Sequence, residues 1–155
     1  RGKTISEAKR GPLPPVFLLG ALLLEWGLHV YLPITRLVPE AWSALGVIPI
    51  ALGVGVIIVA ARQFRKAMTV INPFDQPLAL VTGGVFGLSR NPMYSAMIAI
   101  LIGGAFAWGT LTPFLLPPAM VWVLSRKFIP MEESNLSEVF GEDYDRYKRR
   151  VRRWL

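Results

Sequence analysis

The stretch LPPVFLLGALLLEWGLHVYL at residues 13–32 is apolar over almost its whole length, and prolines bound it at positions 12 and 33. A second apolar stretch, WSALGVIPIALGVGVIIVAA, occupies residues 42–61. Each stretch has about 20 residues, which is the length of helix that crosses the hydrocarbon core of a bilayer. We therefore predict transmembrane helices at about 13–32 and 42–61.

Two shorter apolar runs follow at about 92–108 and 111–126. Only Gly109 and Thr110 separate them, so we predict a tight helical hairpin. The chain is then an all-α integral membrane protein with about four transmembrane helices. The alternative is three spans, in which the last pair forms one re-entrant unit. Three prolines of the last run would bend its helix or shift its start: Pro113, Pro117 and Pro118.

The composition supports a single membrane-embedded domain over residues 1–155. Hydrophobic residues make up 53% of the chain and charged residues 17%, which is too apolar for an ordinary soluble domain of this length. There is no cysteine, and His29 is the single histidine, so we expect neither a disulfide nor a metal site. The chain begins at Arg1 rather than Met, so we expect the native start to lie upstream. We expect no cleavable signal peptide, because the first apolar run is long enough to span.

The basic residues predict the topology. The formal net charge is +7, and in a membrane protein this points to headgroups rather than to nucleic acid. With four spans, all Lys and Arg residues except Arg36 fall on one side, which is 16 of 17. The positive-inside rule then predicts a multi-pass protein with both termini in the cytoplasm. The N-terminal members of this set are Arg1, Lys3, Lys9 and Arg10.

Two polar segments, 63–91 and 130–155, are expected at the cytoplasmic face. The first contains Asn72-Pro73 and Gly83-Gly84, which are strong turn signals. In the second, Pro130 can open a helix whose positive first turn would hold Glu132 and Glu133. Apolar residues follow at helical spacing, so we predict an amphipathic C-terminal helix with a basic end that anchors at the headgroups. Its apolar face would be Leu136, Phe140, Tyr144 and Tyr147.

Ionisable side chains inside membrane helices are candidate sites because they are costly to place there. Glu25 and His29 are four residues apart, so they share a helix face and could pair with each other or with another helix. The simpler interpretation is a buried polar pair that assists packing. The small residues Gly46, Gly53 and Gly55 permit close packing of the second helix. They do not predict an oligomeric state.

Polar side chains concentrate at the cytoplasmic ends of the hairpin. SRNPMY at residues 89–94 precedes the third apolar run, and the hairpin brings it close to the charged residues after the fourth. The two interpretations are a pocket for a polar ligand beside the bilayer and an interfacial ion-pair cluster. The charged residues concerned are Arg126, Lys127, Glu132 and Glu133.

These residues carry a family resemblance. LVTGGVF at 80–86, SRNPMY at 89–94, EExxL at 132–136 and FGEDYxxY at 140–147 occur in this order. The combination, which covers about the last 90 residues, resembles the isoprenylcysteine carboxyl methyltransferase family. That family is related to the membrane phospholipid N-methyltransferases.

The resemblance implies an integral membrane methyltransferase that uses S-adenosyl-L-methionine. Its acceptor would be hydrophobic or membrane-soluble, namely a carboxylate, a thiol or a lipid amine, and it would react at the cytoplasmic face. Arg90 or Arg126 would bind substrate or a ligand carboxylate, and Leu136 is a weaker site candidate. No catalytic residue is assigned, because methyl transfer needs alignment more than acid or base. The cofactor residues implied are Leu78, Ala79, Leu80, Val81, Phe86, Asn91, Pro92, Met93, Tyr94, Glu132 and Glu133.

Three positions depart from the prenylcysteine enzymes. Asn91 stands where those enzymes have histidine, Phe86 where they have tyrosine, and Phe128 where they have a substrate-binding arginine. These changes argue against prenylcysteine as acceptor. Two other functions stay open: a nicotinamide-dependent membrane reductase of the related sterol reductase fold, and a non-catalytic membrane scaffold.

Overall fold

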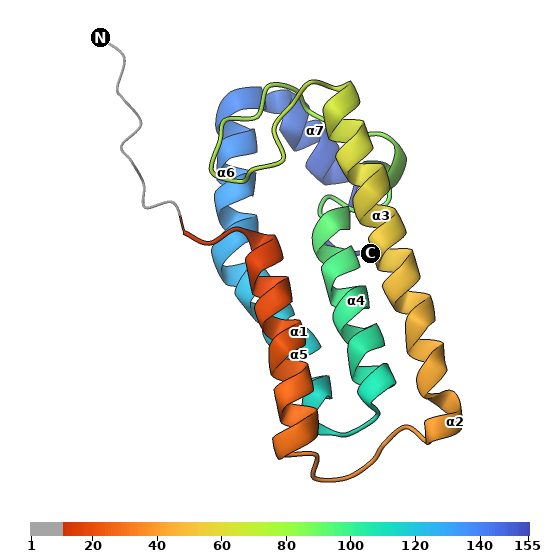
Figure 1. Cartoon of the computed structure of the whole chain (residues 1–155). Helices are drawn as coiled ribbons and strands as arrows, with labels where there is room; N and C mark the ends of the chain where they lie inside the picture. The colour runs from red at the N-terminus through yellow and green to blue at the C-terminus, as the bar shows by residue number, and fades with distance from the viewer. Residues whose placement is uncertain (1–10) are drawn as a thin grey trace.

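The computed structural model describes residues 11–155, and the elements within that range are helical (Figure 1). The one β-type contact among them is an isolated bridge between Arg36 and Thr110. The predicted all-α class is therefore confirmed. The predicted topology signals at Arg1, Lys3, Lys9 and Arg10 lie outside the described residues.

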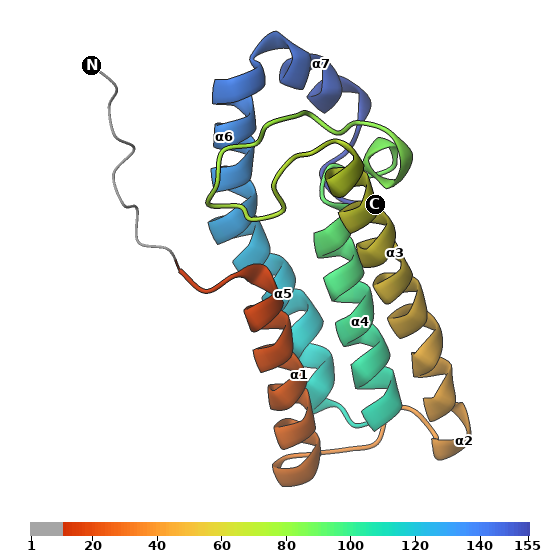
Figure 2. The same ribbon diagram turned by 45° about the horizontal axis from the view of Figure 1, so that its top comes forward.

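Four long helical segments run alongside one another in Figures 1 and 2: α1, α3, α4 and α5. Proline stands in the first turn of α1 and of α4, where its missing N–H leaves no intrahelical bond unmade. Short turns of helix lead into α3 and α5. The bounds are α1 Pro14–Tyr31, α2 Glu40–Ser43, η1 Ala44–Gly46, α3 Val47–Lys66, η2 Gly84–Gly87, α4 Pro92–Trp108, η3 Thr112–Leu115 and α5 Leu116–Val123.

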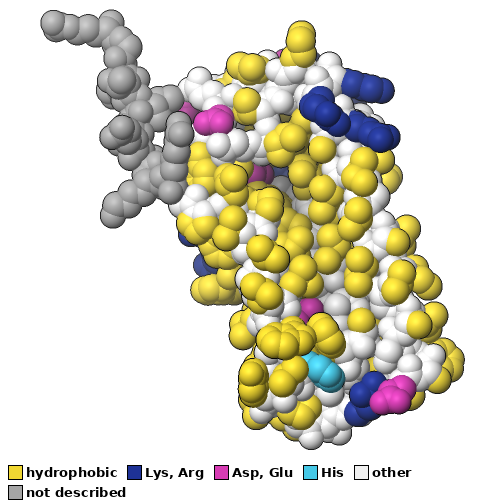
Figure 3. Space-filling model, in the orientation of Figure 1, with side chains coloured by type: hydrophobic (Ala, Val, Ile, Leu, Met, Phe, Trp, Pro, Cys, Tyr) yellow, Lys and Arg dark blue, Asp and Glu magenta, His cyan; other side chains and the backbone are white. Residues whose placement is uncertain are grey.

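Two helices are long and apolar enough to cross a bilayer: α1 and the continuous segment Glu40–Lys66. The helix α4 is apolar but shorter. Large hydrophobic side chains are exposed along both long helices, among them Leu23 and Leu52, which are 61% and 64% exposed. Figure 3 shows hydrophobic side chains over most of the length of this face, with the charged ones mainly near its ends. Such a surface indicates a membrane protein.

Glycines set the distance between α3 and α4. A Cβ placed on Gly46 would collide with the backbone of Gly103, and a Cβ on Gly103 would lie 2.5 Å from the carbonyl oxygen of Gly46. A Cβ on Gly53 would lie 2.6 Å from the carbonyl oxygen of Ala96. Gly55, in contrast, faces open space. The close packing expected of these glycines therefore occurs within the chain at two of the three positions.

The predicted helical hairpin is present between α4 and α5. Gly109 ends α4 with φ +74°, a left-handed conformation that favours glycine, and its N–H donates to the carbonyl of Ala105. Its own carbonyl accepts from the N–H groups of Leu37 and Val38. Thr112 at the start of η3 donates its hydroxyl to the carbonyl oxygen of Leu32 at 2.7 Å. The hairpin turn is thus tied to the ends of α1 and of the α1–α2 connection.

The fourth predicted helix does not end at residue 126. Its backbone passes through a five-residue π-helical segment, η4 Leu124–Phe128, directly into α6 Ile129–Phe140. Pro130 stands in the first turn of α6 together with Glu132, as predicted. This turn continues the preceding π-helical segment, however, so it is not a free helix N-terminus. A proline ring clashes with the carbonyl four residues earlier in a regular α-helix, and the wider π turn before Pro130 relieves that clash.

The C-terminal segment is two helices rather than one. Gly141 has φ +48° and breaks the helix, after which α7 Glu142–Arg150 folds across the end of the bundle where α3 ends and α4 begins (Figure 2). Tyr144 and Tyr147 are buried by this turn, at 1% and 3% exposure. Leu136 and Phe140 lie on α6, so the four residues do not form one helix face. The correction follows from the left-handed glycine, which redirects the chain.

Glu25 and His29 do not pair with each other. His29 Nδ1 lies 3.0 Å from Thr110 Oγ1, and its ring stacks on Trp108 with centroids 5.1 Å apart. Glu25 is fully buried against Gly104 of α4, and its carboxylate has no hydrogen-bond partner among residues 11–155. Both side chains therefore contact the α4–α5 hairpin rather than each other.

The glycine contact makes a direct prediction. Gly53→Val should destabilise the protein by about 1–3 kcal/mol, because the added side chain overpacks the α3–α4 contact. Gly55→Val, two residues away on the open face, should leave stability nearly unchanged. Thermal unfolding of both variants in the same detergent measures the difference. Equal melting temperatures for the two variants would contradict this account of the packing.

Candidate functional site

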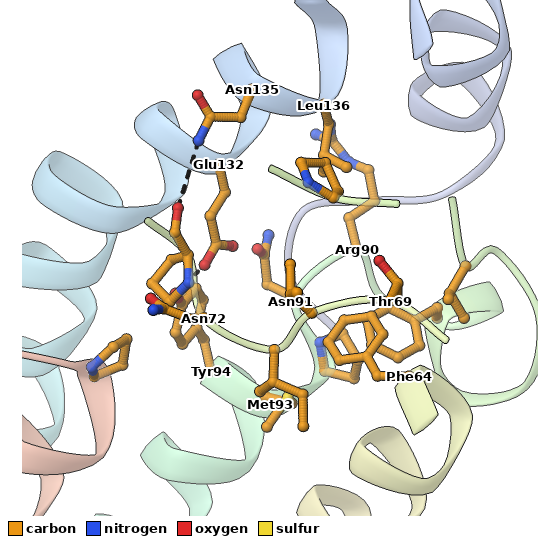
Figure 4. A pocket seen from close by; sticks show the side chains of 18 of the residues that line it. Phe64, Thr69, Asn72, Arg90, Asn91, Met93, Tyr94, Glu132, Asn135 and Leu136 are labelled. Atoms are coloured by element: carbon orange, nitrogen blue, oxygen red, sulfur yellow. Dashed lines mark hydrogen bonds between the residues drawn. The ribbon is translucent and has the colours of Figure 1, made fainter. Parts of the chain in front are cut away.

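A cavity of about 490 Å³ lies at the end of the bundle where α3 ends and α4 begins. Its walls come from the first turns of α1 and α4, the last turns of α3, the α3–α4 loop and α6. Most of the lining is apolar, and the polar groups gather where α6 faces the start of α4 (Figure 4). The continuous helix from α5 to α6 is what carries this polar wall out of the bundle and over the cavity.

The cavity collects most of the predicted cofactor residues. Nine of the eleven line it, and Arg90 lines it too. Leu78 does not line it and is 71% exposed, and Glu133 and Arg126 are also absent from its lining. The nine are Ala79, Leu80, Val81, Phe86, Asn91, Pro92, Met93, Tyr94 and Glu132.

Glu132 is the main acidic group of this wall. It reaches from α6 toward Tyr94 on α4, and the Tyr94 hydroxyl donates a hydrogen bond to its Oε1 (Figure 4). Burial raises the pKa of Glu132 to about 7, an effect that the hydrogen bond from Tyr94 opposes and the charge of Glu133 adds to. The carboxyl therefore changes charge near neutral pH, and a cation bound beside it would favour the ionised form.

Glu133 faces away from the cavity and is held by two arginines. Its Oε1 lies 3.2 Å from the Arg90 guanidinium, and its Oε2 lies 2.6 Å from that of Arg153. Arg90 also donates to the hydroxyl of Tyr144 at 3.4 Å. Burial and the charge of Glu133 raise the pKa of Tyr144, so its hydroxyl stays protonated at neutral pH. Of the two adjacent carboxylates, Glu132 faces ligand space and Glu133 joins α6 to the C-terminal segment.

The residues after α7 fold back against the loop before α4. The carbonyl of Arg153 accepts from Ser89 Oγ at 3.1 Å and from Asn91 Nδ2 at 3.0 Å. The N–H of Arg90 donates to the carbonyl of Arg152 at 2.8 Å. Because its amide nitrogen is used in this way, Asn91 keeps Oδ1 as an acceptor. Asn91 lines the cavity, and its bond to the C-terminal segment leaves Oδ1 as the side-chain atom available to accept a hydrogen bond there.

Side chains fix the course of the α3–α4 loop. Thr69 Oγ1 accepts from the N–H groups of Leu78 and Ala79, at 3.0 and 3.2 Å. Gln63 at the end of α3 donates to the carbonyl of Gly83 at 3.0 Å, and a Cβ on Gly84 would collide with this amide. Gly84 also has φ +58°. The loop segment that lines the cavity is therefore held by α3 from one side.

A second set of bonds ties the loop to the C-terminal helices. The hydroxyl of Tyr147 on α7 donates to the carbonyl of Phe86 at 2.6 Å. Asn135 on α6 donates to the carbonyl of Pro73 at 3.4 Å (Figure 4). These bonds hold the loop between α3 and the two C-terminal helices, so the loop encloses the cavity on that side.

Several lining residues were not predicted from the sequence. Phe64 from α3 and the first turns of α1 contribute apolar wall, and these segments carried no signal beyond their hydrophobicity. The sequence signal at Asn72-Pro73 indicates only a turn. The polar side chains of that turn, and Asn135 three residues after Glu132, are the features from which their place in the lining could have been predicted. The polar lining residues missed are Thr69, Asn72, Asp75, Asn135 and Tyr147.

Phe128 occupies the position where the prenylcysteine enzymes have a substrate-binding arginine. Phe128 is fully buried and packs edge-on against Phe17, with ring centroids 5.3 Å apart, and against Tyr94 at 6.4 Å. Arg126 is exposed and lies outside the cavity lining. The basic side chain that reaches the lining is Arg90, whose charge Glu133 already balances. A buried carboxyl in an apolar cavity suits a ligand that is cationic at one end and apolar elsewhere.

Comparison with known proteins identifies relatives. A model of the phospholipid methyltransferase family matches residues 41–143. A probable protein-S-isoprenylcysteine O-methyltransferase of Oryza sativa subsp. indica is 25% identical over 118 residues, which cover 72% of this chain and 61% of that protein. Protein-S-isoprenylcysteine O-methyltransferase B of Arabidopsis thaliana is 30% identical over 95 residues, covering 61% and 47%.

A third relative is the protein-S-isoprenylcysteine O-methyltransferase of Schizosaccharomyces pombe, 29% identical over 72 residues that cover 46% of this chain and 30% of that protein. The chain therefore spans about 61% or less of the length of these three relatives. No solved structure matches it at a significant level. Within the part that the structure describes, no group of three His, Cys, Asp or Glu residues could hold a metal ion.

The raised pKa of Glu132 predicts how stability depends on pH. Its pKa is about 7 in the folded protein and 4.5 in the reference state, so the folded state retains a proton that the unfolded state releases between these values. Stability should fall as pH rises from about 4.5 to 7, by at most about 3 kcal/mol from this group. Glu132→Gln should flatten that dependence, and Glu138→Gln, an exposed residue on the same helix, should not. Melting temperature against pH measures both, and parallel curves for wild type and Glu132→Gln would refute the assignment.

Proposed function

This chain belongs to the phospholipid methyltransferase family, and on that premise we propose that it transfers a methyl group from S-adenosylmethionine to a membrane-soluble acceptor. The observation that carries the proposal is the cavity, which gathers nine predicted cofactor residues around one buried carboxyl, Glu132. S-adenosylmethionine has a sulfonium, an ammonium and a carboxylate on an otherwise partly apolar molecule. The chemistry of the cavity fits that combination of groups.

The residues divide the binding between them. Glu132 pairs with the cationic end of the cofactor, and Asn91 Oδ1 accepts a hydrogen bond there. Arg90 is the lining cation available to the cofactor's carboxylate, while keeping its contact with Glu133. The loop segment Ala79–Val81 and Phe86 supply apolar contact and backbone groups. Glu133 holds the wall in place rather than contacting the ligand.

The reaction needs alignment from the protein more than acid or base. When bound, S-adenosylmethionine would supply the methyl carbon, whose bond to sulfur breaks as the acceptor's lone pair attacks it. The electrons of that bond stay with sulfur, which becomes a neutral thioether, and a neutral amine or thiol acceptor releases its proton to water. The apolar walls exclude water and hold the acceptor in line with that carbon. Pro14, Leu18 and Ile57 belong to these walls and lie on α1 and α3, the two candidate membrane helices. The acceptor therefore reaches the cavity from the bilayer.

The topology we propose has four spans, at about 13–32, 42–61, 92–108 and 111–126, with both termini cytoplasmic. Two features support it: α4 and α5 stand beside α1 and α3, and the hairpin turn lies at the same end as Arg36 (Figure 1). Among residues 11–155, Arg36 is the one basic residue at that end, where its guanidinium lies 3.9 Å from Glu40. The other basic residues of this range flank the cavity end, as the positive-inside rule requires of a cytoplasmic face.

The acceptor we propose is an amine or a thiol on a hydrophobic molecule. A carboxylate acceptor would need a cation beside it. Among residues 11–155 the basic side chain in the lining is Arg90, which is shared with Glu133 and needed by the cofactor. Phe128 fills the position of the family arginine with a buried ring. A neutral amine or thiol enters such a cavity at a lower desolvation cost than a second anion.

Cofactor binding tests the proposal directly. Calorimetric titration of S-adenosylhomocysteine into the detergent-purified chain should show binding, and Glu132→Ala should weaken it at least tenfold. Glu138→Ala, an exposed carboxylate on the same helix, is the matched control and should bind as wild type does. Because Glu132 acts in its ionised form, affinity should increase as pH rises through about 7.

The same titration separates the other functions. Binding of NADPH in place of S-adenosylhomocysteine would favour the membrane reductase. Binding of neither ligand by folded protein would favour the scaffold and would overturn the methyltransferase proposal.

The acceptor class has its own test. With radiolabelled S-adenosylmethionine, we expect methyl transfer to a long-chain amine or thiol to exceed transfer to a prenylcysteine carboxylate at least tenfold. The reason is the missing counter-charge at Phe128. A preference for the carboxylate would contradict the proposed acceptor while leaving the cofactor site intact.

A further inference from the structure

A second hollow lies between α1 and α5, on a different side of α1 from the cavity. It is a groove of about 340 Å³, and every residue that lines it is apolar. Ala21, Leu116 and Met120 form its buried floor, and Val16 and Leu24 stand exposed along its edge. It shares no residue with the cavity and plays no part in the proposed reaction.

Small residues create the groove. Gly20 and Ala21 on α1 face Ala119 on α5 across it, and a Cβ placed on Gly20 would meet nothing within 4 Å. Small residues normally let two membrane helices touch, but here the facing sides stay apart. The helices are joined at their other end, where Thr112 donates to Leu32. The space left between them is apolar and elongated, which suits a hydrocarbon chain.

A cation, Lys127, stands at one end of the groove, and a second, Arg126, precedes it in the chain. The Lys127 Nζ lies 5.1 Å from the ring centroid of Phe17, which also lines the groove, and 5.6 Å from that of Phe128. Arg126 is its exposed neighbour. Within residues 11–155 neither side chain has a carboxylate within 4.0 Å, whereas Arg36, Arg90, Arg146, Lys148 and Arg153 each have one.

We propose that this groove binds one acyl chain of an anionic phospholipid, with the lipid phosphate paired to Lys127 and Arg126. The apolar groove and the two cations lie at the two depths that the chain and the headgroup of such a lipid occupy. A neutral lipid would gain only the apolar contact. A two-fold dimer across the groove would bring the Lys127 side chains of both copies to the same depth, where like charges repel.

The lipid would brace the N-terminal half of α1. That half also lines the cavity through Leu13, Pro14 and Leu18, on another side of the same helix. A chain seated in the groove fills the gap between α1 and α5 and holds this wall in position. Anionic lipid should therefore raise the melting temperature, and this effect does not depend on the chain being a methyltransferase.

Native mass spectrometry of the detergent-purified chain tests the proposal. With phosphatidylglycerol and phosphatidylcholine of the same acyl chains in equal amounts, we expect at least tenfold more bound phosphatidylglycerol. The double variant Arg126→Ala and Lys127→Ala should lose that preference. Gly20→Leu, which fills the groove, should lose the bound lipid itself. Matched controls should bind as wild type does: Arg65→Ala with Lys66→Ala at the exposed end of α3, and Gly55→Leu on the open face of α3.

Three outcomes would overturn the proposal. The first is equal binding of the two lipids by wild type. The second is phosphatidylglycerol binding that survives both the charge variant and Gly20→Leu. The third is a dimer that Gly20→Leu abolishes, which would assign the groove to a second copy of the chain. Thermal unfolding in detergent without added lipid shows that each variant is folded before its lipid binding is compared.

Discussion

At the contact between α3 and α4 the two backbones approach each other closely, and this contact determines the positions of the other elements. At Gly46, Gly53 and Gly103 no Cβ can be added without striking a carbonyl oxygen or a side chain of the facing helix. Helices that approach so closely gain dispersion energy along their length without needing water to drive them together. Because the contact is rigid, the end of α3, with Phe64 and Gln63, stands beside the start of α4, with Asn91 and Tyr94. Those four residues position the loop and one wall of the cavity.

The opposite wall of the cavity depends on a helix that continues beyond the bundle. The π turn before Pro130 lets one continuous helix run from Leu116 to Phe140, so the direction of α6 is set by its packing inside the bundle. Adjacent residues on a helix point about 100° apart, which separates the two carboxylates of α6. Glu132 faces Tyr94 and the cavity, whereas Glu133 faces Arg90 and Arg153. The two adjacent carboxylates thereby have different positions: Glu132 lines the cavity, and Glu133 attaches the C-terminal segment.

The charge balance around the cavity connects structure to function. Arg90 lines the cavity, but its guanidinium already contacts the Glu133 carboxylate and the Tyr144 hydroxyl. The buried ring of Phe128 and the exposed position of Arg126 leave little positive charge facing the cavity. The chain belongs to a methyltransferase family, but the charges around its cavity are not those expected for binding a prenylcysteine carboxylate. On another side of α1, in contrast, Lys127 stands beside an apolar groove, and among residues 11–155 it has no carboxylate within 4.0 Å. The lipid site that we propose there is separate from the cavity.

The sequence by itself determined what depends on neighbouring residues. The lengths of the apolar runs gave the helices, Gly109 and Thr110 gave the hairpin, and the order of the polar motifs gave the family and nine lining residues of the cavity. Only the tertiary structure decided the partners of Glu133, the exposure of Arg126, the role of Thr69 and Asn135, and the break at Gly141. Those features depend on contacts between segments that are tens of residues apart, or on the direction that a helix takes after a turn. Hydrophobicity and spacing report a residue's local environment, whereas a pairing such as Asn91 with the Arg153 carbonyl exists only after the chain has folded back on itself.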